Sequence, residues 1–142
     1  MTESFTSVSI DSLPAVTQDE MVEVDRLMVD VYGIRLLQMM ENAGLNLARL
    51  VRSRLGGSAK DKEILVLAGS GNNAGGGIVA ARRLAGWGAD VRIITAREPK
   101  TYLGVPAEQL RSTTQIGIPV AELEGELPVC DTLVDAVIGY SP

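Results

Sequence analysis

The residues best suited to chemistry lie in a glycine-rich stretch, GSGNNAGGG, at residues 69–77. It follows an apolar run of strand length, residues 64–68, and precedes a helical pattern at residues 78–86. Glycines let a backbone approach a ligand closely, and the unpaired N–H groups at a helix start attract phosphate. The amides of Asn72 and Asn73 can donate and accept hydrogen bonds. We therefore expect a ligand-binding turn, with a purely structural turn as the alternative.

Two aspartates mark a second candidate region, Asp131 and Asp135, near the ends of a strand expected at residues 132–138. An acid in an apolar strand is costly to bury unless it is paired or bound to a cation. In a sheet that places this strand beside residues 64–68, Asp135 lies close to the asparagine pair. Strand alternation puts Val137 and Gly139 on the same face as Asp135. We expect Asp135 to be functional and name it the candidate catalytic residue; capping of a loop or pairing with an arginine is the alternative.

The composition excludes several classes of site. The chain has no histidine, which excludes Ser-His-Asp triads, histidine-ligated metals and imidazole acid–base chemistry. A general acid or base must then be Asp, Glu, Lys, Tyr or Cys. The net charge of −5 does not suit a chain that binds nucleic acid phosphates.

The single cysteine, Cys130, cannot form an intrachain disulfide and is expected to be a small buried residue. No secretory signal and no apolar run of about 20 residues is visible in the sequence. We therefore expect a cytoplasmic protein that does not bind membranes.

The elements that must position these residues alternate between helices and strands. A capping box of Thr17 and Glu20 predicts a helix that ends at Gly33, and a second helix is expected at residues 36–55. Further helices are expected at 78–86 and 107–116, and strands at 64–68, 91–95, 119–123 and 132–138. This order predicts an α/β fold, a three-layer sandwich with a mostly parallel sheet, preceded by two helices. Residues 1–11 are expected to be a flexible leader and residues 12–142 the domain.

One nucleotide-binding pattern is present in a weak form. Gly69, Gly71 and Ala74 match the spacing of the dinucleotide fingerprint, and Glu98 lies beyond the second expected strand, where a ribose-binding acid can sit. No Lys-Ser or Lys-Thr closes the turn, so it is not a P-loop. An ordinary NAD-dependent oxidoreductase is therefore one alternative reading.

Three blocks together resemble a known family. They are TQDEM with VDR at residues 17–26, QMMENAG at residues 38–44, and the glycine-rich stretch with its following helix at residues 69–84. The segment from Val134 to Gly139 also fits. In this order and spacing the blocks resemble the YjeF N-terminal domain family, whose enzymatic members are NAD(P)H-hydrate epimerases. The resemblance covers residues 13–142.

The resemblance implies a Rossmann-like three-layer fold, usually homodimeric, that interconverts the R and S forms of hydrated NADH and NADPH. A repair dehydratase then restores the cofactor. It implies that a potassium ion is held by Asn73 and Asp135, and that Gly139 opens a second substrate-binding loop. It also implies that the substrate site is lined by Asn72, Asn73, Ala74, Gly75 and Gly76.

Two departures from the family pattern keep an alternative open. Gly76 stands where the family has an aspartate, and Ala74 replaces a glycine. By the same resemblance, residues 12–142 correspond to about the N-terminal two-thirds of such a domain. The alternative is a non-catalytic member of the fold that serves as a dimerisation or ligand-binding module.

Overall fold

The computed structural model describes residues 7–139 of the chain. By internal contacts the chain divides into two compact units, Met1–Arg35 and Leu36–Pro142. The expected boundary between a leader at 1–11 and a domain at 12–142 stays a prediction, and residues 1–6 of that leader lie outside the described part.

The first unit is helical. It contains a 3₁₀ turn η1 (Ile10–Ser12), helix α1 (Gln18–Arg26) and a π-helical turn η2 (Leu27–Val31). The predicted capping box is confirmed: the Thr17 N–H donates to Glu20 Oε2 at 2.6 Å, and the Glu20 N–H donates to Thr17 Oγ1 at 3.3 Å. The Thr17 hydroxyl also donates to Glu20 Oε2, at 3.0 Å, and the two bonds from Thr17 to the carboxylate lower the pKa of Glu20. Gly33, at a φ of +67°, follows the helical segment, as expected.

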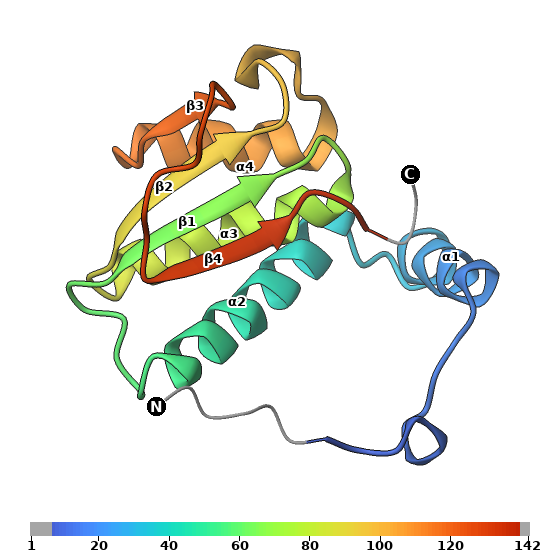
Figure 1. Ribbon diagram of the computed structural model, residues 1–142. Coiled ribbons are helices and arrows are strands. Elements are labelled where there is room, and N and C mark those ends of the chain that lie inside the picture. Colours follow the sequence, from blue (N-terminus) through green and yellow to red (C-terminus); the bar gives the residue numbers. More distant parts are fainter. Residues whose placement is uncertain (1–6, 140–142) are drawn as a thin grey trace. The chain divides into compact units, whose positions relative to one another are not determined.

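The second unit is built around a parallel sheet of four strands (Figure 1). The sheet order is β3-β2-β1-β4, and all three neighbouring pairs are parallel. The elements, in chain order, are α2 (Leu36–Arg54), β1 (Glu63–Ala68), α3 (Asn72–Gly86), β2 (Asp90–Thr95), η3 (Pro99–Thr101), α4 (Gly104–Gln115), β3 (Val120–Glu122) and β4 (Thr132–Ala136). The predicted parallel α/β fold is confirmed.

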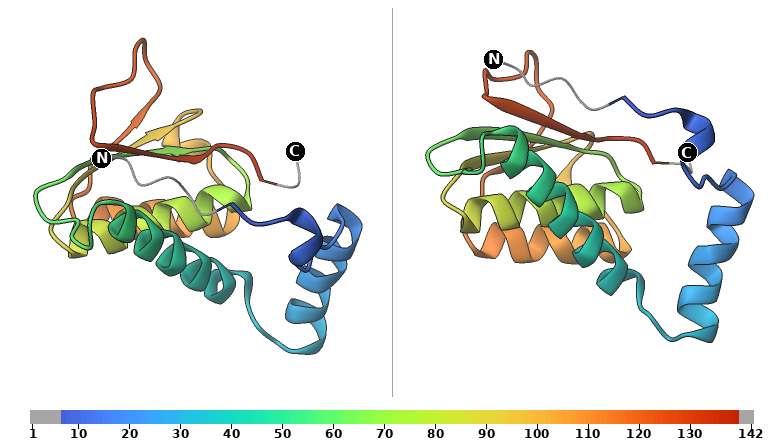
Figure 2. Two further views of the ribbon diagram at one scale, coloured as in Figure 1. Left: turned by 60° about the horizontal axis from the view of Figure 1, so that its bottom comes forward. Right: turned by 90° about the horizontal axis from the view of Figure 1, so that it is seen from below.

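The helices α2, α3 and α4 lie on one face of this sheet, as both turned views show (Figure 2). The side chains on that face are buried and include Val66, Ile93 and Val134. On the opposite face Arg92 and Leu133 are exposed, and the segment joining β3 to β4 passes over it. The described residues of this unit therefore supply the sheet and one helical layer.

Close packing of glycines fixes α3 against its neighbours. A Cβ atom added to Gly44 of α2 would lie 2.4 Å from the Val79 Cβ atom, and one added to Gly77 would lie 2.5 Å from the Ala136 Cβ atom. Neither gap admits a side chain. These two glycines allow α3 to sit between α2 and β4, and through this packing they position the first turn of α3.

The main difference from expectation is where α3 begins. The helix was predicted from Ile78, but it starts at Asn72, so that Asn72–Gly77 are helical. Glycine has low helix propensity, about 1 kcal/mol less favourable than alanine per residue. Burial of Gly75, Gly76 and Gly77 among neighbouring elements outweighs that cost here. The strand expected at 132–138 is also shorter and ends at Ala136.

Candidate functional site

The strand order predicts a ligand-binding crevice outside the carboxyl ends of β1 and β4. The connection from β1 leads through α3 toward β2, whereas β4 lies on the other side of β1, so the order reverses at this point. The last paired residues are Ala68 of β1 and Ala136 of β4. Ligands of open α/β sheets bind outside the carboxyl ends of the strands at such a reversal.

Gly69 directly follows β1, at the place where this crevice is expected. Its N–H donates to the Ala136 carbonyl at 3.1 Å, which extends the pairing of β1 with β4 by one residue. A Cβ atom at Gly69 would lie 1.9 Å from the carbonyl oxygen of Val137. The first glycine of the stretch is thus required by a close approach of two backbone segments, which is a structural reason for its presence.

Asn73 joins α3 to the segment after β4. Its Nδ2 atom donates to the carbonyl oxygen of Ile138 at 3.0 Å. A Cβ atom on Gly139 would lie 3.0 Å from the Asn73 Cβ atom, so Gly139 is packed against this side chain. The structure therefore brings together two residues that the sequence analysis placed in one site, Asn73 and Gly139.

The first turn of α3 offers free amide groups. Gly71 is the N-cap residue and provides no side-chain hydrogen bond to the helix start. Asn72 and Asn73 are exposed beside it. Uncapped N–H groups at a helix start bind anions such as phosphate. This end of the crevice is thus suited to a phosphorylated ligand.

The next three candidate substrate-binding residues, Ala74, Gly75 and Gly76, are buried. The side-chain positions of the two glycines face α2: a Cβ atom on Gly75 would lie 3.4 Å from Met40 Cγ, and one on Gly76 would lie 3.9 Å from Ala43 Cβ. The part of all three residues in substrate binding stays a prediction.

Asp135 lies beside β1, as expected, but it is not buried. It pairs in register with Leu67, and its side chain is exposed. Its Oδ1 atom accepts the Val137 N–H at 3.0 Å. The expectation of a buried acid is wrong because the described helices cover only the other face of the sheet. Within residues 7–139, no hydrogen bond or ion pair joins Asp135 to Asn72 or Asn73.

Asp131 is a structural residue at the opposite end of the sheet. Its Oδ2 atom accepts the Glu63 N–H at 2.9 Å, and its own N–H donates to the Glu63 carbonyl at 2.8 Å. These bonds tie the starts of β1 and β4 together. The two aspartates are therefore not one constellation, and only Asp135 lies near the crevice.

Tyr102 is a residue near the site that sequence reasoning missed. It is 3% exposed, and its hydroxyl donates to the Ala68 carbonyl at 2.8 Å. Burial raises the pKa of this hydroxyl, which keeps it a donor. The Ala96 N–H donates to the same carbonyl at 3.0 Å, so the Ala68 carbonyl at the end of β1 accepts two hydrogen bonds. In the sequence Tyr102 stands between Thr101 and Leu103, and no local pattern marks it as a site residue.

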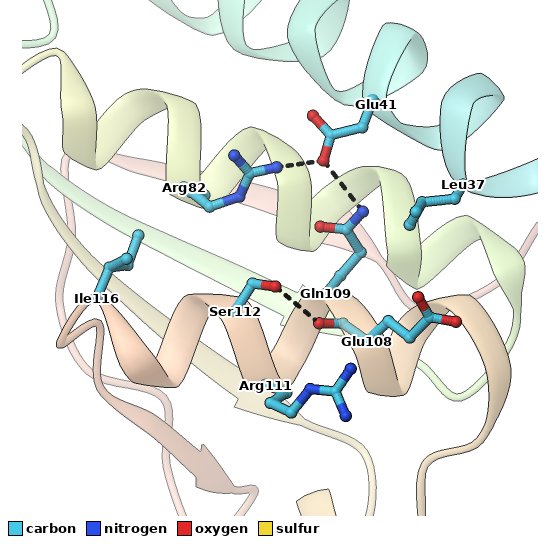
Figure 3. A pocket seen from close by; sticks show the side chains of 8 residues that line it. All are labelled: Leu37, Glu41, Arg82, Glu108, Gln109, Arg111, Ser112 and Ile116. Carbon is cyan, nitrogen blue, oxygen red and sulfur yellow. Dashed lines mark hydrogen bonds and ion pairs between the residues drawn. The ribbon is translucent and has the colours of Figure 1, made fainter.

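A separate cavity of about 370 Å³ lies among the helices (Figure 3). Its lining includes Glu41 of α2, Arg82 of α3 and Gln109 of α4. Glu41 forms ion pairs with Arg82 and, at 2.7 Å, with Arg83, and it accepts from Gln109 at 3.1 Å. Burial alone would raise the pKa of Glu41, but the hydrogen bonds and charges of these partners lower it. The carboxylate thus cross-links three helices, away from the crevice.

Among the residues that the structure describes, no group of three or more acidic or cysteine side chains is arranged to hold a metal ion. No described helix is long and apolar enough to cross a membrane.

Comparison with known proteins identifies relatives of this chain. The sequence pattern of the family described as "YjeF-related protein N-terminus" matches residues 36–142. A protein of Dehalogenimonas lykanthroporepellens named NAD(P)H-hydrate epimerase is 40% identical over 145 residues, which cover 99% of this chain and 58% of the relative. A protein of Thermofilum pendens named bifunctional NAD(P)H-hydrate repair enzyme Nnr is 37% identical, over 82% of this chain and 23% of that one.

A solved structure has a similar fold. The crystal structure of yeast ynu0 superposes with a TM-score of 0.75 at 26% identity, covering 91% of this chain and 58% of the yeast chain. The chain therefore spans little more than half the length of the first relative and of this structure.

Proposed function

Because this chain belongs to the family of YjeF-related protein N-termini, we propose that it carries NAD(P)H-hydrate epimerase activity. The reaction would interconvert the R and S forms of hydrated NADH and NADPH. The observation that carries this proposal is the junction of Asn73 with Ile138 and Gly139, because it joins a helix start to the strand end that holds Asp135.

The crevice offers the two kinds of group that such a substrate needs. The uncapped first turn of α3, with Asn72 and Asn73, would bind the phosphates of the dinucleotide. The end of β4 then lies beside the other half of the substrate. Inverting a carbon that carries a hydroxyl group requires a bond there to break and to form again on the opposite face. Asp135 is the acid that we assign to proton transfer, since the chain has no histidine.

A potassium ion is part of the proposal, held by Asn73 and Asp135. Both side chains carry oxygen atoms, the ligand type that hard cations prefer. Asn73 donates through Nδ2, which leaves Oδ1 as an acceptor, and Asp135 uses only Oδ1 for the Val137 amide. When bound, the ion would supply positive charge against the Asp135 carboxylate and the substrate phosphates.

Three further proposals concern the partners of the protein and its location in the cell. The names of the bifunctional relatives support a functional link to a dehydratase that acts on the product. We propose a homodimer, which a solution mass of twice 15.1 kDa would support and a monomer mass would contradict. We place the protein in the cytoplasm because its one cysteine cannot form an intrachain disulfide.

The direct test is an epimerase assay. The purified chain is mixed with both epimers of hydrated NADPH and a dehydratase that consumes one of them, and the recovery of NADPH from the other is followed. We expect faster recovery than the spontaneous rate and a loss of at least about tenfold in Asn73→Ala. Asn46→Ala, an exposed asparagine of α2, is the matched control and should behave as the unaltered chain. Recovery at the spontaneous rate contradicts the proposal.

One observation favours a second candidate function. Gly76 stands where the family has an aspartate. A chain without that carboxylate would serve as a ligand-binding or dimerisation module of the same fold. Binding of hydrated NADPH without epimerisation would support this reading.

A further inference from the structure

The carboxyl end of β2 carries an arginine that lies over a fixed aromatic ring. Arg97 follows the last residue of β2 by two positions. Its guanidinium carbon lies 5.5 Å from the centroid of the Tyr102 ring. Because the Tyr102 hydroxyl is bonded to the Ala68 carbonyl, the ring links the arginine to the end of β1. A guanidinium over an aromatic face is held in place while its N–H groups stay available.

The neighbouring side chains leave the charge of Arg97 available. Thr95 donates its hydroxyl to the Ala121 carbonyl at 3.1 Å, and Ala96 has no polar side chain. Glu98 pairs with Lys100 at 3.7 Å. Arg97 is exposed and forms no ion pair with a carboxylate among residues 7–139.

The acidic side chains nearby do not neutralise the charge of Arg97. Glu122, at the end of β3, acts on Tyr102 through its charge but forms no ion pair with Arg97 in the described part of the chain. From the sequence, Glu98 is the acid expected to bind the ribose. The structure instead pairs Glu98 with a lysine and gives Arg97 the aromatic platform.

The strand order relates this end of β2 to the crevice. In sheets of order 3-2-1-4, a dinucleotide lies with its pyrophosphate at the helix start after the first strand and a ribose near the end of the second. An acid there binds the ribose 2′-hydroxyl, whereas an arginine accommodates a 2′-phosphate. In this chain the second strand is β2, which pairs with β1 in register from Glu63↔Asp90 to Ala68↔Thr95.

Building on the proposed function, we propose that Arg97, held by Tyr102, is a subsite for the 2′-phosphate of hydrated NADPH. The chain then prefers hydrated NADPH over hydrated NADH. Arg97 offers paired N–H donors in a plane, which match the oxygens of a phosphate group. Hydrated NADH has a hydroxyl group at this position and gains no charge-assisted bond.

The first test compares the two substrates. The ratio of kcat/KM for hydrated NADPH to that for hydrated NADH should exceed one in the unaltered chain. It should fall about fivefold to tenfold in Arg97→Gln, the range expected for one charge-assisted contact at an exposed site. Arg97→Lys should retain part of the preference, because it keeps the charge but not the planar fork.

The matched control is Arg92→Gln. Arg92 is an exposed arginine within β2, three residues and about 10 Å before the carboxyl end of the strand. The substitution removes the same charge but leaves the end of β2 intact, so the substrate ratio should not change. An unchanged ratio in Arg97→Gln, or an equal change in Arg92→Gln, overturns the inference.

A second measurement does not require turnover. Binding of adenosine 2′,5′-bisphosphate and of AMP to the chain is followed by calorimetry. The bisphosphate should bind at least about fivefold more tightly than AMP to the unaltered chain and equally to Arg97→Gln. If neither hydrated cofactor is epimerised, the proposed function fails, and this binding difference still decides the inference. Equal affinities in the unaltered chain overturn it.

Discussion

Replacing Gly69 with alanine tests the geometry of the crevice most sharply. The added Cβ atom would lie 1.9 Å from the carbonyl oxygen of Val137, and real Cβ atoms essentially never come closer than 3.0 Å to another heavy atom. The backbone at the end of β1 or after β4 must then move by about 1.1 Å, which also endangers the bond from the Gly69 N–H to Ala136. Overpacking costs about 1–3 kcal/mol and the lost hydrogen bond about 0.5–1.5 kcal/mol.

These terms together give about 1.5–4.5 kcal/mol of lost stability. For a chain of this length that corresponds to a Tm lower by about 5–15 °C. The assay is thermal unfolding followed by circular dichroism or calorimetry. Gly71→Ala is the matched control, because Gly71 has an extended backbone with a φ of −87° and no atom within 4 Å of its added Cβ. A Gly69→Ala protein as stable as Gly71→Ala would refute the close approach of the two segments.

Three further outcomes follow from the structure. Gly76→Asp should raise kcat/KM for epimerisation by at least about tenfold if the missing carboxylate limits the reaction. The position can take the added Cβ atom, whose nearest neighbours in α2 would lie at 3.9 and 4.0 Å. Asp135→Asn should abolish the epimerisation, so that the rate is the same with potassium as with tetramethylammonium in its place. Full activity in that variant would remove Asp135 from the mechanism. Glu41→Gln should lower the Tm at neutral pH by several degrees. Because the folded pKa of Glu41 is lowered, the stabilisation by its ion pairs is full above the ordinary pKa of a glutamate, 4.5, and is lost as the pH falls through the folded pKa. The Tm difference should therefore shrink as the pH falls below about 4, and a constant difference would contradict the ion-pair role.

The sequence was sufficient where local patterns and burial agree. The capping box at Thr17 predicted the start of α1, and an apolar run at residues 64–68 predicted β1. The pairing of the last strand with β1, on which the expected position of Asp135 rests, is also confirmed. Each of these features depends on residues that are close in sequence or on the general rules of parallel sheets.

The remaining features depend on packing between distant residues. The start of α3 at Asn72 is decided by contacts of Gly75 with Met40 and of Gly77 with Ala136, and helix propensity alone predicts a turn there. The exposure of Asp135 depends on which face the helices cover. Tyr102 and Arg97 are near the site only because the segment after β2 folds back onto the end of β1.

The central claim is that the substrate binds at the carboxyl ends of β1 and β4. The most direct measurement is the mapping of amide chemical shifts by NMR while hydrated NADPH is added to the chain. We expect the largest changes at residues 69–74 and 135–139, where Asn73 joins the two segments. Changes that gather instead around Glu41, Glu108 and Arg111, which line the cavity between the helices, would contradict the account.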